Sequence, residues 1–196
     1  MVRHAANAIN ILGVDYQHPS ETTRSIKILN NLFYDIDGGK WGNGGGGILV
    51  LLNGPGTSEL EFSQNTAIHT GSCLQFEDGS NVTGLNVTNN IMRFHILGAG
   101  LAGTEALERF AGGHVTVQNN AIVLSEKRDY WITRYPSNNL YPESYDTVGF
   151  SNLAGSDYSL RASSSLKRNA TGKGEVGVNL AQLAGAGVLQ EASLAK

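Results

Sequence analysis

Two carboxylates stand two positions apart in the segment YDIDGG, at residues 34–39. On a β-strand, side chains two positions apart lie on the same face, so Asp35 and Asp37 would point the same way. Such a pair could act as general acid and base on a glycosidic bond. It could also bind a cation, and a calcium ion is the one cofactor that the sequence suggests near Asp35 and Asp37.

A histidine and an arginine would join this pair if the repeats of the chain are stacked. Asp35 and His69 each stand four residues after an asparagine of a repeated line, and Arg93 stands three residues after the next one. Neighbouring parallel strands lie about 4.8 Å apart. An aspartate beside a histidine raises the imidazole pKa and suits it to proton transfer. Arg93 could pair with the carboxylate of a uronate while a base removes its C5 proton, as in β-elimination.

We therefore predict that Asp35, Asp37, His69 and Arg93 are catalytic residues on one solvent-exposed face. The alternative interpretation is an ordinary polar surface with weak ion pairs.

Three further residues are candidates for substrate binding. Tyr34 and Trp41 flank the two aspartates and could stack on sugar rings, although Trp41 could equally pack over its own glycine-rich loop. Glu77 could add a charge near the site, although a role in a turn is the simpler interpretation. The histidines and Cys73 show no zinc-ligand spacing, so we predict no metal beyond the calcium considered above.

A repeated line of residues must position these side chains. It has two apolar residues two apart, followed three positions later by an asparagine, at gaps of 34, 25 and 30 residues. Alternating apolar residues indicate short strands with one buried face. The four copies are IKILNN (26–31), LEFSQN (60–65), LNVTNN (85–90) and VTVQNN (115–120).

We predict that Asn31, Asn65, Asn90 and Asn120 stack at one corner as a ladder of hydrogen-bonded amides. Leucine-rich repeats also place an asparagine after a strand, but their repeat length is fairly constant, and here the spacing varies and further strands follow the asparagine.

The predicted fold is all-β, a single right-handed parallel β-helix (a solenoid) of about five coils over residues 1–179. Residues 180–196 form a C-terminal tail in this prediction. Asn179 is a good helix N-cap, so the tail could hold a short helix that lies across the last coil or along its flank.

The sequence resembles the C-terminal part of bacterial right-handed parallel β-helix proteins of the pectate-lyase-like superfamily. The resemblance rests on the repeated lines and on the segment at 148–179, which is similar to the usual last coil of these proteins. Ser165, where proline is common, and the closure at 175–179 depart from the pattern. The resemblance implies a carbohydrate-active protein, either a polysaccharide lyase or a glycoside hydrolase. It is specific for fold and weak for activity, because this scaffold has many functions.

Composition argues against several other classes. The formal net charge is −3, and charged residues make up 16% of the chain, so no basic face for nucleic acid is expected. No apolar run is long enough for a membrane span. The glycines at 98, 100 and 103 match a dinucleotide fingerprint, but the next repeat follows too soon, so we expect a loop there and no such cofactor.

Partners and location follow from the same features. We expect a polysaccharide as partner, and no nucleic acid or membrane. The register suggests that the chain opens partway round a coil, so we expect a homodimer that covers this N-terminal end. The alternative function is a non-catalytic structural or carbohydrate-binding fragment that self-associates through the same end. Members of the superfamily are usually secreted, whereas MVRHAANAIN at 1–10 lacks a signal-peptide pattern, so no location is predicted.

Overall fold

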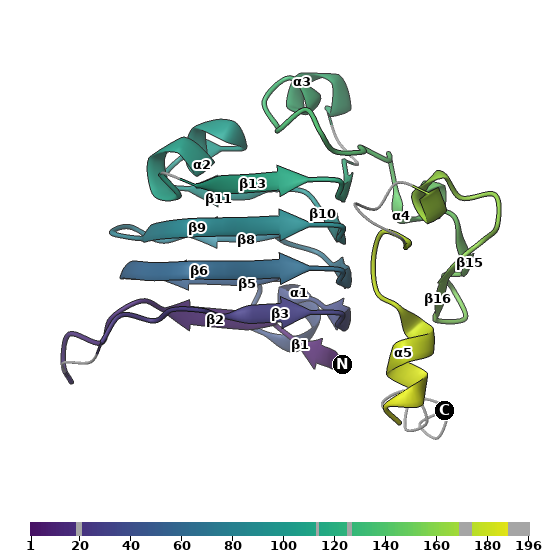
Figure 1. The fold of residues 1–196 in the computed structure, drawn as a ribbon, viewed down its shortest axis with the longest axis horizontal. Coiled ribbons are helices and arrows are strands. Elements are labelled where there is room, and N and C mark those ends of the chain that lie inside the picture. Colours follow the sequence, from purple (N-terminus) through teal and green to yellow (C-terminus); the bar gives the residue numbers. More distant parts are fainter. Residues whose placement is uncertain (19–20, 113, 125–126, 169–173, 188–196) are drawn as a thin grey trace.

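Most of the chain forms three parallel sheets whose strands follow one another in a repeated order (Figure 1). The structure is a computed structural model and describes residues 1–18, 21–112, 114–124, 127–168 and 174–187. Each pass of the chain contributes one strand to the first, second and third sheet in turn. Each inner strand of a sheet therefore pairs with the strands of the previous and the next pass, and the end strands pair on one side only.

The three sheets have these members. The first contains β1 (Val2–Ala5), β4 (Leu32–Ile36), β7 (Thr66–His69), β10 (Ile91–Arg93) and β14 (Ala121–Val123). The second contains β2 (Ile9–Leu12), β5 (Val50–Asn53), β8 (Leu74–Phe76), β11 (Ile96–Gly98) and the antiparallel β12 (Leu101–Ala102). The third contains β3 (Lys27–Leu29), β6 (Pro55–Ser63), β9 (Asn81–Thr88) and β13 (Val115–Gln118).

The alternating apolar residues of the repeats form the main core. Leu60 and Phe62 of β6 are each 1% exposed, and they pair in register with Leu85 and Val87 of β9. Phe33 stacks on Phe62 with ring centroids 6.2 Å apart. Burial of one such large apolar side chain stabilises the fold by about 1.5–3 kcal/mol, which explains why the sequence alternation is strict in these strands.

The predicted asparagine row is present and has a fifth member. Each side-chain amide donates to the next side-chain oxygen: Asn31 to Asn65 at 3.1 Å, Asn65 to Asn90 at 3.0 Å, and Asn90 to Asn120 at 2.9 Å. Asn120 continues the series by donating to Asn139 at 2.9 Å. Each acceptor oxygen in this series also accepts from the backbone N–H of the preceding asparagine. Each member of the row is therefore hydrogen-bonded to the next through both its side chain and its backbone.

The remaining elements lie outside the three sheets. The fourth sheet is the antiparallel pair of β15 (Phe150–Asn152) and β16 (Asp157–Leu160). The helices are α1 (Gly38–Trp41), α2 (Thr104–Phe110), α3 (Arg128–Ile132), α4 (Tyr145–Val148), α5 (Leu180–Gly185) and the 3₁₀ turn Ser165–Arg168.

The predicted fold class is wrong. A single right-handed parallel β-helix of about five coils over residues 1–179 does not describe this chain, which divides into four sheets, mostly parallel, together with short helices. The parallel strands end at β14, and from Arg128 onward the described residues form short helices, the antiparallel pair and irregular segments, with one parallel bridge from Leu140 to Ala121. The physical reason is that the repeated line, two apolar residues two apart with an asparagine three positions later, does not recur after Asn120. The segment after it is rich in tyrosine and proline and packs as irregular structure instead.

The C-terminal part covers the outer face of the first sheet and forms a second apolar cluster with it. Ile91 and Val123 of this sheet pack with side chains from residues 148–183. α5 begins at the predicted place, where the Asn179 side chain accepts from the Gln182 N–H at 3.1 Å. It lies along the flank, because the Asn30 side chain donates to Gln182 at 3.0 Å. Of the predicted tail, residues 188–196 lie outside the described residues. The predicted homodimer stays a prediction.

We expect Asn90→Ala to lower the free energy of unfolding by roughly 1–3 kcal/mol, because it leaves buried donors and acceptors of its neighbours without partners. Asn90 is 0% exposed and sits in the middle of the row. Urea denaturation followed by circular dichroism measures the change. The matched control is Asn43→Ala in an exposed loop, which should have little effect. Equal effects of the two substitutions would contradict the role of the row.

Candidate functional site

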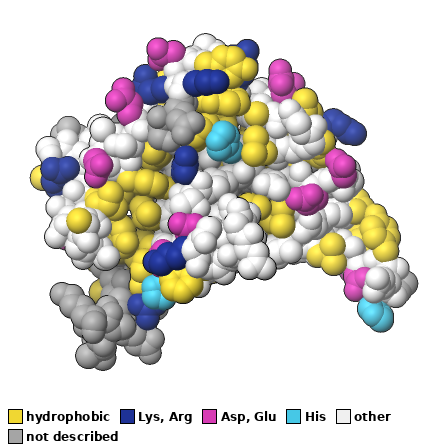
Figure 2. Space-filling model, turned by 180° about the vertical axis from the view of Figure 1, so that it is seen from behind, with side chains coloured by type: hydrophobic (Ala, Val, Ile, Leu, Met, Phe, Trp, Pro, Cys, Tyr) yellow, Lys and Arg dark blue, Asp and Glu magenta, His cyan; other side chains and the backbone are white. Residues whose placement is uncertain are grey.

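The candidate site is a pocket of about 440 Å³ beside the first sheet, where the C-terminal part leaves that sheet uncovered. All four residues predicted as catalytic line it. The complete lining is Asp35, Ile36, Asp37, Ile68, His69, Thr70, Arg93, Val123, Ser144 and Tyr145. Figure 2 shows basic, acidic and histidine side chains close to hydrophobic ones in the lower part of this face of the molecule.

A bulge in β4 decides which of these side chains face solvent. The register between β4 and β7 shifts between Phe33 and Ile36, so that His69 pairs with Ile36. Asp35 has a positive φ of 56°, which turns it out of the regular pleat. The predicted register, with Asp35 and His69 side by side, is therefore wrong by one residue. A one-residue slip moves a side chain to the other face of a strand, and His69 points inward like Ile36.

His69 is buried, with 3% of its surface exposed, and not on the solvent face that the sequence predicted. Both ring nitrogens have backbone partners: Nδ1 lies 3.2 Å from the Gly47 carbonyl oxygen, and the Arg93 N–H donates to Nε2 at 2.9 Å. Burial lowers the pKa of His69 to about 3, and the nearby Arg93 charge acts in the same direction. The ring is therefore a neutral cross-link between backbone segments, and it has no free nitrogen to act as a base.

Asp35 is already neutralised by a cation. Lys40 Nζ lies 3.0 Å and 2.9 Å from its two carboxylate oxygens, and His4 Nε2 lies 3.6 Å from one of them. His4 stands opposite Asp35 in β1 and also has a positive φ, of 55°. The bulge thus brings Asp35, Lys40 and His4 together on the surface.

Asp37 has a structural role at the start of α1. Its Oδ1 accepts from the N–H groups of Gly39 at 2.8 Å and Lys40 at 3.1 Å, which caps the helix. No described residue bonds to the second carboxylate oxygen, Oδ2, which therefore remains available to a ligand. The two aspartates therefore contact different partners, Lys40 Nζ for Asp35 and the first N–H groups of α1 for Asp37.

Arg93 is the side chain of the pocket with the most spare hydrogen-bonding capacity. Its Nη1 donates to the Thr70 carbonyl oxygen at 2.6 Å. Within the described ranges, no residue accepts from Nε or Nη2, and Arg93 forms no ion pair. A guanidinium held at one nitrogen and open at the others is suited to bind a carboxylate.

The predicted substrate-binding residues divide into two groups. Tyr34 and Trp41 lie by the Asp35 cluster: the Tyr34 hydroxyl accepts from Arg3 at 2.8 Å, and Trp41 is 43% exposed. His4 stacks on Trp41 with ring centroids 5.0 Å apart. Glu77 is elsewhere, on the second sheet after β8, where it accepts from Gln75 at 3.0 Å. It does not line this pocket.

Sequence reasoning missed two residues that shape the site. Lys40 neutralises Asp35, as described above. Tyr145, the first residue of α4, donates to the Ala67 carbonyl oxygen at 2.8 Å, and burial raises the pKa of its hydroxyl. Lys40 stands within five residues of Asp35, so their proximity could have been noticed. Tyr145 lies in the segment without repeats, where no register could place it.

The glycines that match a dinucleotide fingerprint are explained by packing. A Cβ on Gly103 would lie 2.2 Å from the Arg134 carbonyl oxygen, and its φ is 62°. A Cβ on Gly98 would lie 2.5 Å from the Phe110 ring. The expected loop is in part a helix, because α2 starts directly after Gly103.

The described residues form neither a metal-binding cluster nor a membrane-spanning helix. In the described part of the chain, no group of three or more His, Cys, Asp or Glu side chains could hold a metal ion. A calcium ion at Asp35 and Asp37 stays a prediction. The described helices are all too short or too polar to cross a membrane.

Comparison of the chain with protein-family models, with curated proteins and with solved structures found no match. The resemblance to the pectate-lyase-like superfamily therefore stays a prediction, and function must be argued from the pocket itself.

We expect His69 to make the protein less stable as the pH falls below 6.5. The unfolded chain binds a proton near the ordinary histidine pKa, whereas burial delays protonation in the folded state until about pH 3. Between pH 7.5 and 5, this difference should remove about 2 kcal/mol of the free energy of unfolding. Urea denaturation at both pH values measures it.

The control is the exposed histidine His18, whose His18→Gln variant should keep the full pH dependence, while His69→Gln should lose most of it. An NMR titration of the native protein gives an independent test, in which the His69 ring signals should not move between pH 7.5 and 5. Titration of His69 in that range would contradict its burial as a neutral ring.

Proposed function

We propose that this protein binds an acidic saccharide in the pocket beside the first sheet and does not cleave it. The observation that carries the proposal is Arg93, which lines the pocket, donates one hydrogen bond to Thr70 and has its other guanidinium nitrogens open. A planar guanidinium forms two parallel hydrogen bonds to a carboxylate, so a uronate unit is a suitable ligand.

The charges at the pocket leave Arg93 open to an anion. Arg93 and Lys40, which contacts Asp35, supply two positive charges, and Asp35 and Asp37 supply two negative charges. The contact with Lys40 neutralises Asp35, so that carboxylate repels an anionic ligand only weakly. The free Oδ2 of Asp37 can accept from a sugar hydroxyl, as polar side chains in saccharide sites do.

An aromatic side chain extends the site beyond the pocket. Trp41 is 43% exposed, and it follows Lys40 directly in α1. Lys40 Nζ lies 4.8 Å from the centre of its ring, and His4 stacks against it, so the indole is held in place. A fixed exposed indole can stack on the apolar face of a sugar ring. A second sugar unit bound next to the uronate would find this surface.

Binding without cleavage follows from the state of the histidine. A β-elimination needs a base near the C5 proton, and the predicted base, His69, has both nitrogens bonded to the backbone. Its pKa of about 3 further limits its use as a proton acceptor. The catalytic roles predicted for Asp35 and Asp37 also lack support, because each carboxylate already has partners. Asp35 is paired with Lys40, and Asp37 caps α1.

Isothermal titration calorimetry with tetragalacturonate tests the proposal. We expect binding by the native protein, at least about tenfold weaker binding by Arg93→Gln, which keeps the polar shape and loses the charge, and a smaller loss for Trp41→Ala. Arg109→Gln on α2, outside the lining of this pocket, is the matched control and should bind like the native protein.

Two outcomes would contradict the proposal. Equal binding of tetragalacturonate and a neutral tetrasaccharide would remove the argument from Arg93. An increase in ultraviolet absorbance from an unsaturated product, or release of shorter saccharides, would show cleavage and turn the site into an active site.

A further inference from the structure

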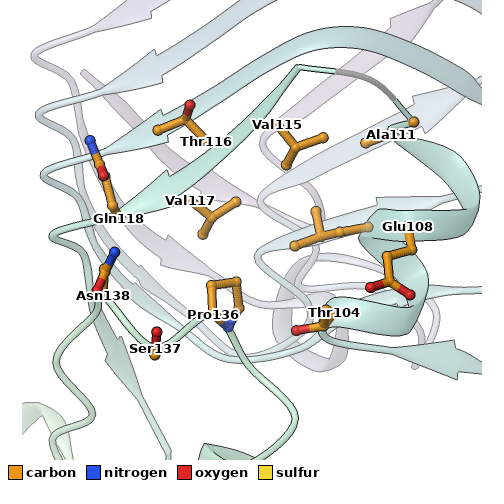
Figure 3. Close-up of a pocket in the computed structure, with 12 residues that line it drawn as sticks. Thr104, Glu108, Ala111, Val115, Thr116, Val117, Gln118, Pro136, Ser137 and Asn138 are labelled. Carbon is orange, nitrogen blue, oxygen red and sulfur yellow. The ribbon is translucent and has the colours of Figure 1, made fainter.

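A second groove lies at the last strand of the third sheet, away from the saccharide pocket. It has a volume of about 580 Å³ and is bounded by β13, α2 and residues 136–138 (Figure 3). We call it the β13 groove. Figure 3 shows Val115 and Val117 on β13 along one side, with Glu108 of α2 and Pro136 across from them.

The outer edge of β13 has no partner strand. β13 is the last strand of the third sheet and pairs only with β9 among the described strands. The Asn89 N–H donates to the Gln118 carbonyl oxygen, so Gln118 directs its backbone groups toward β9. Backbone groups of successive residues alternate in direction along a strand. Val115 and Val117 therefore direct theirs outward, into the groove.

Most of these outward groups have no partner among the described residues. The Val117 carbonyl oxygen accepts from the Asn139 side chain at 2.9 Å. Within the part of the chain that the structure describes, nothing bonds to the outward N–H and C=O of Val115 or to the N–H of Val117. Unpaired groups in a row at a strand edge are a template for another strand.

The edge of the adjacent first sheet shows what the groove would accept. Residues 138–142 run along Asn119, which follows β13, and along β14, the last strand of the first sheet. Their carbonyl groups accept from Asn119 at 2.6 Å, Ile122 at 2.9 Å and Leu124 at 2.8 Å. The bridge between Ala121 and Leu140 is parallel. The described part of the chain thus fills this row over β14 and places no strand beside Val115 and Val117.

The walls of the groove select a single strand with a positive charge. α2 and Pro136 lie across the groove from the free edge, and the space between suits one strand of about four residues, roughly 13 Å long at 3.3 Å per residue. A second folded copy would have to insert a whole sheet into this groove. Glu108 is exposed and forms no ion pair with a described residue, so its carboxylate is available to a lysine or arginine.

We propose that the β13 groove binds an extended basic peptide of a partner protein, which adds a parallel strand to the outer edge of β13. The backbone groups of Val115 and Val117 supply affinity, and Glu108 selects a basic residue. This role is independent of saccharide binding.

A short synthetic peptide tests the proposal by NMR. The probe is acetyl-Lys-Leu-Asn-Val-Thr-amide, which copies residues 85–88, the strand that β13 itself pairs with, behind one lysine. We expect saturable binding with shifts at β13 and α2. The protein variant Val115→Pro removes one outward N–H at the first position of the strand, where proline is tolerated. It should weaken binding at least about tenfold, and the matched control Val115→Ala should weaken it much less.

Charge is tested separately. Glu108→Lys should weaken binding of this probe and improve binding of a probe with glutamate in place of lysine, whereas Glu105→Lys, on the same helix outside the groove lining, should change little. Equal binding of the probe by Val115→Pro and Val115→Ala would overturn the proposal.

Hydrogen exchange tests the free edge on the native protein, so this test does not depend on whether a variant folds. The amides of Val115 and Val117 should exchange much faster than those of Thr116 and Gln118, and the peptide should slow them. Slow exchange of all four amides without peptide would show that the edge is not free and would overturn the proposal. Self-association that Val115→Pro abolishes would also overturn the proposal, because the edge would then bind a second copy.

Discussion

The asparagine row is the interaction on which the rest of the structure depends. Each amide satisfies a side chain and a backbone N–H of its neighbours and donates to a backbone carbonyl, so the corner between the third and first sheets has few spare polar groups. Asn65, Asn90 and Asn120 are fully buried there. A buried amide without partners costs about 1–3 kcal/mol, so this corner tolerates only asparagine in a fixed register. That register determines which residues of neighbouring strands in the first sheet pair with each other.

At the candidate site, a local departure from this register places charged side chains on the surface. Without the bulge at Asp35, this residue would pair with His69, as a regular count from the asparagines implies. The bulge turns the carboxylate outward to Lys40 and His4, and it aligns His69 with Ile36 in the core. β-Bulges commonly re-aim side chains next to functional sites. The histidine then holds two backbone segments together beneath the pocket, and Arg93 is left as its main binding group.

The sequence predicted what depends on repetition and failed where repetition stops. The strands, the asparagine row and the N-cap at Asn179 could be inferred, because each is encoded by local pattern and by a corner that needs one residue type. The fold-class prediction is wrong because it extends the coils to residue 179, where only the resemblance of segment 148–179 to a last coil supports them and the repeated line with its asparagine is missing. The site prediction found four pocket residues but misjudged His69, since a bulge has no signature that a count of positions can detect. Asn139 and Tyr145 come from the segment without repeats, where tertiary packing alone places them.

The spacing of the asparagine row also has a consequence for how the protein folds. Its side-chain bonds join residues 34, 25, 30 and 19 positions apart, so each bond closes a long loop before it contributes any stability. Chains dominated by such non-local contacts fold slowly, because the entropy cost of closing each loop must be met before the contact can stabilise the chain. Each closed loop also presents its amide to the next asparagine and aligns the following strand. We therefore expect one pair of asparagines to form first and the remaining hydrogen bonds of the row to form one after another from that pair.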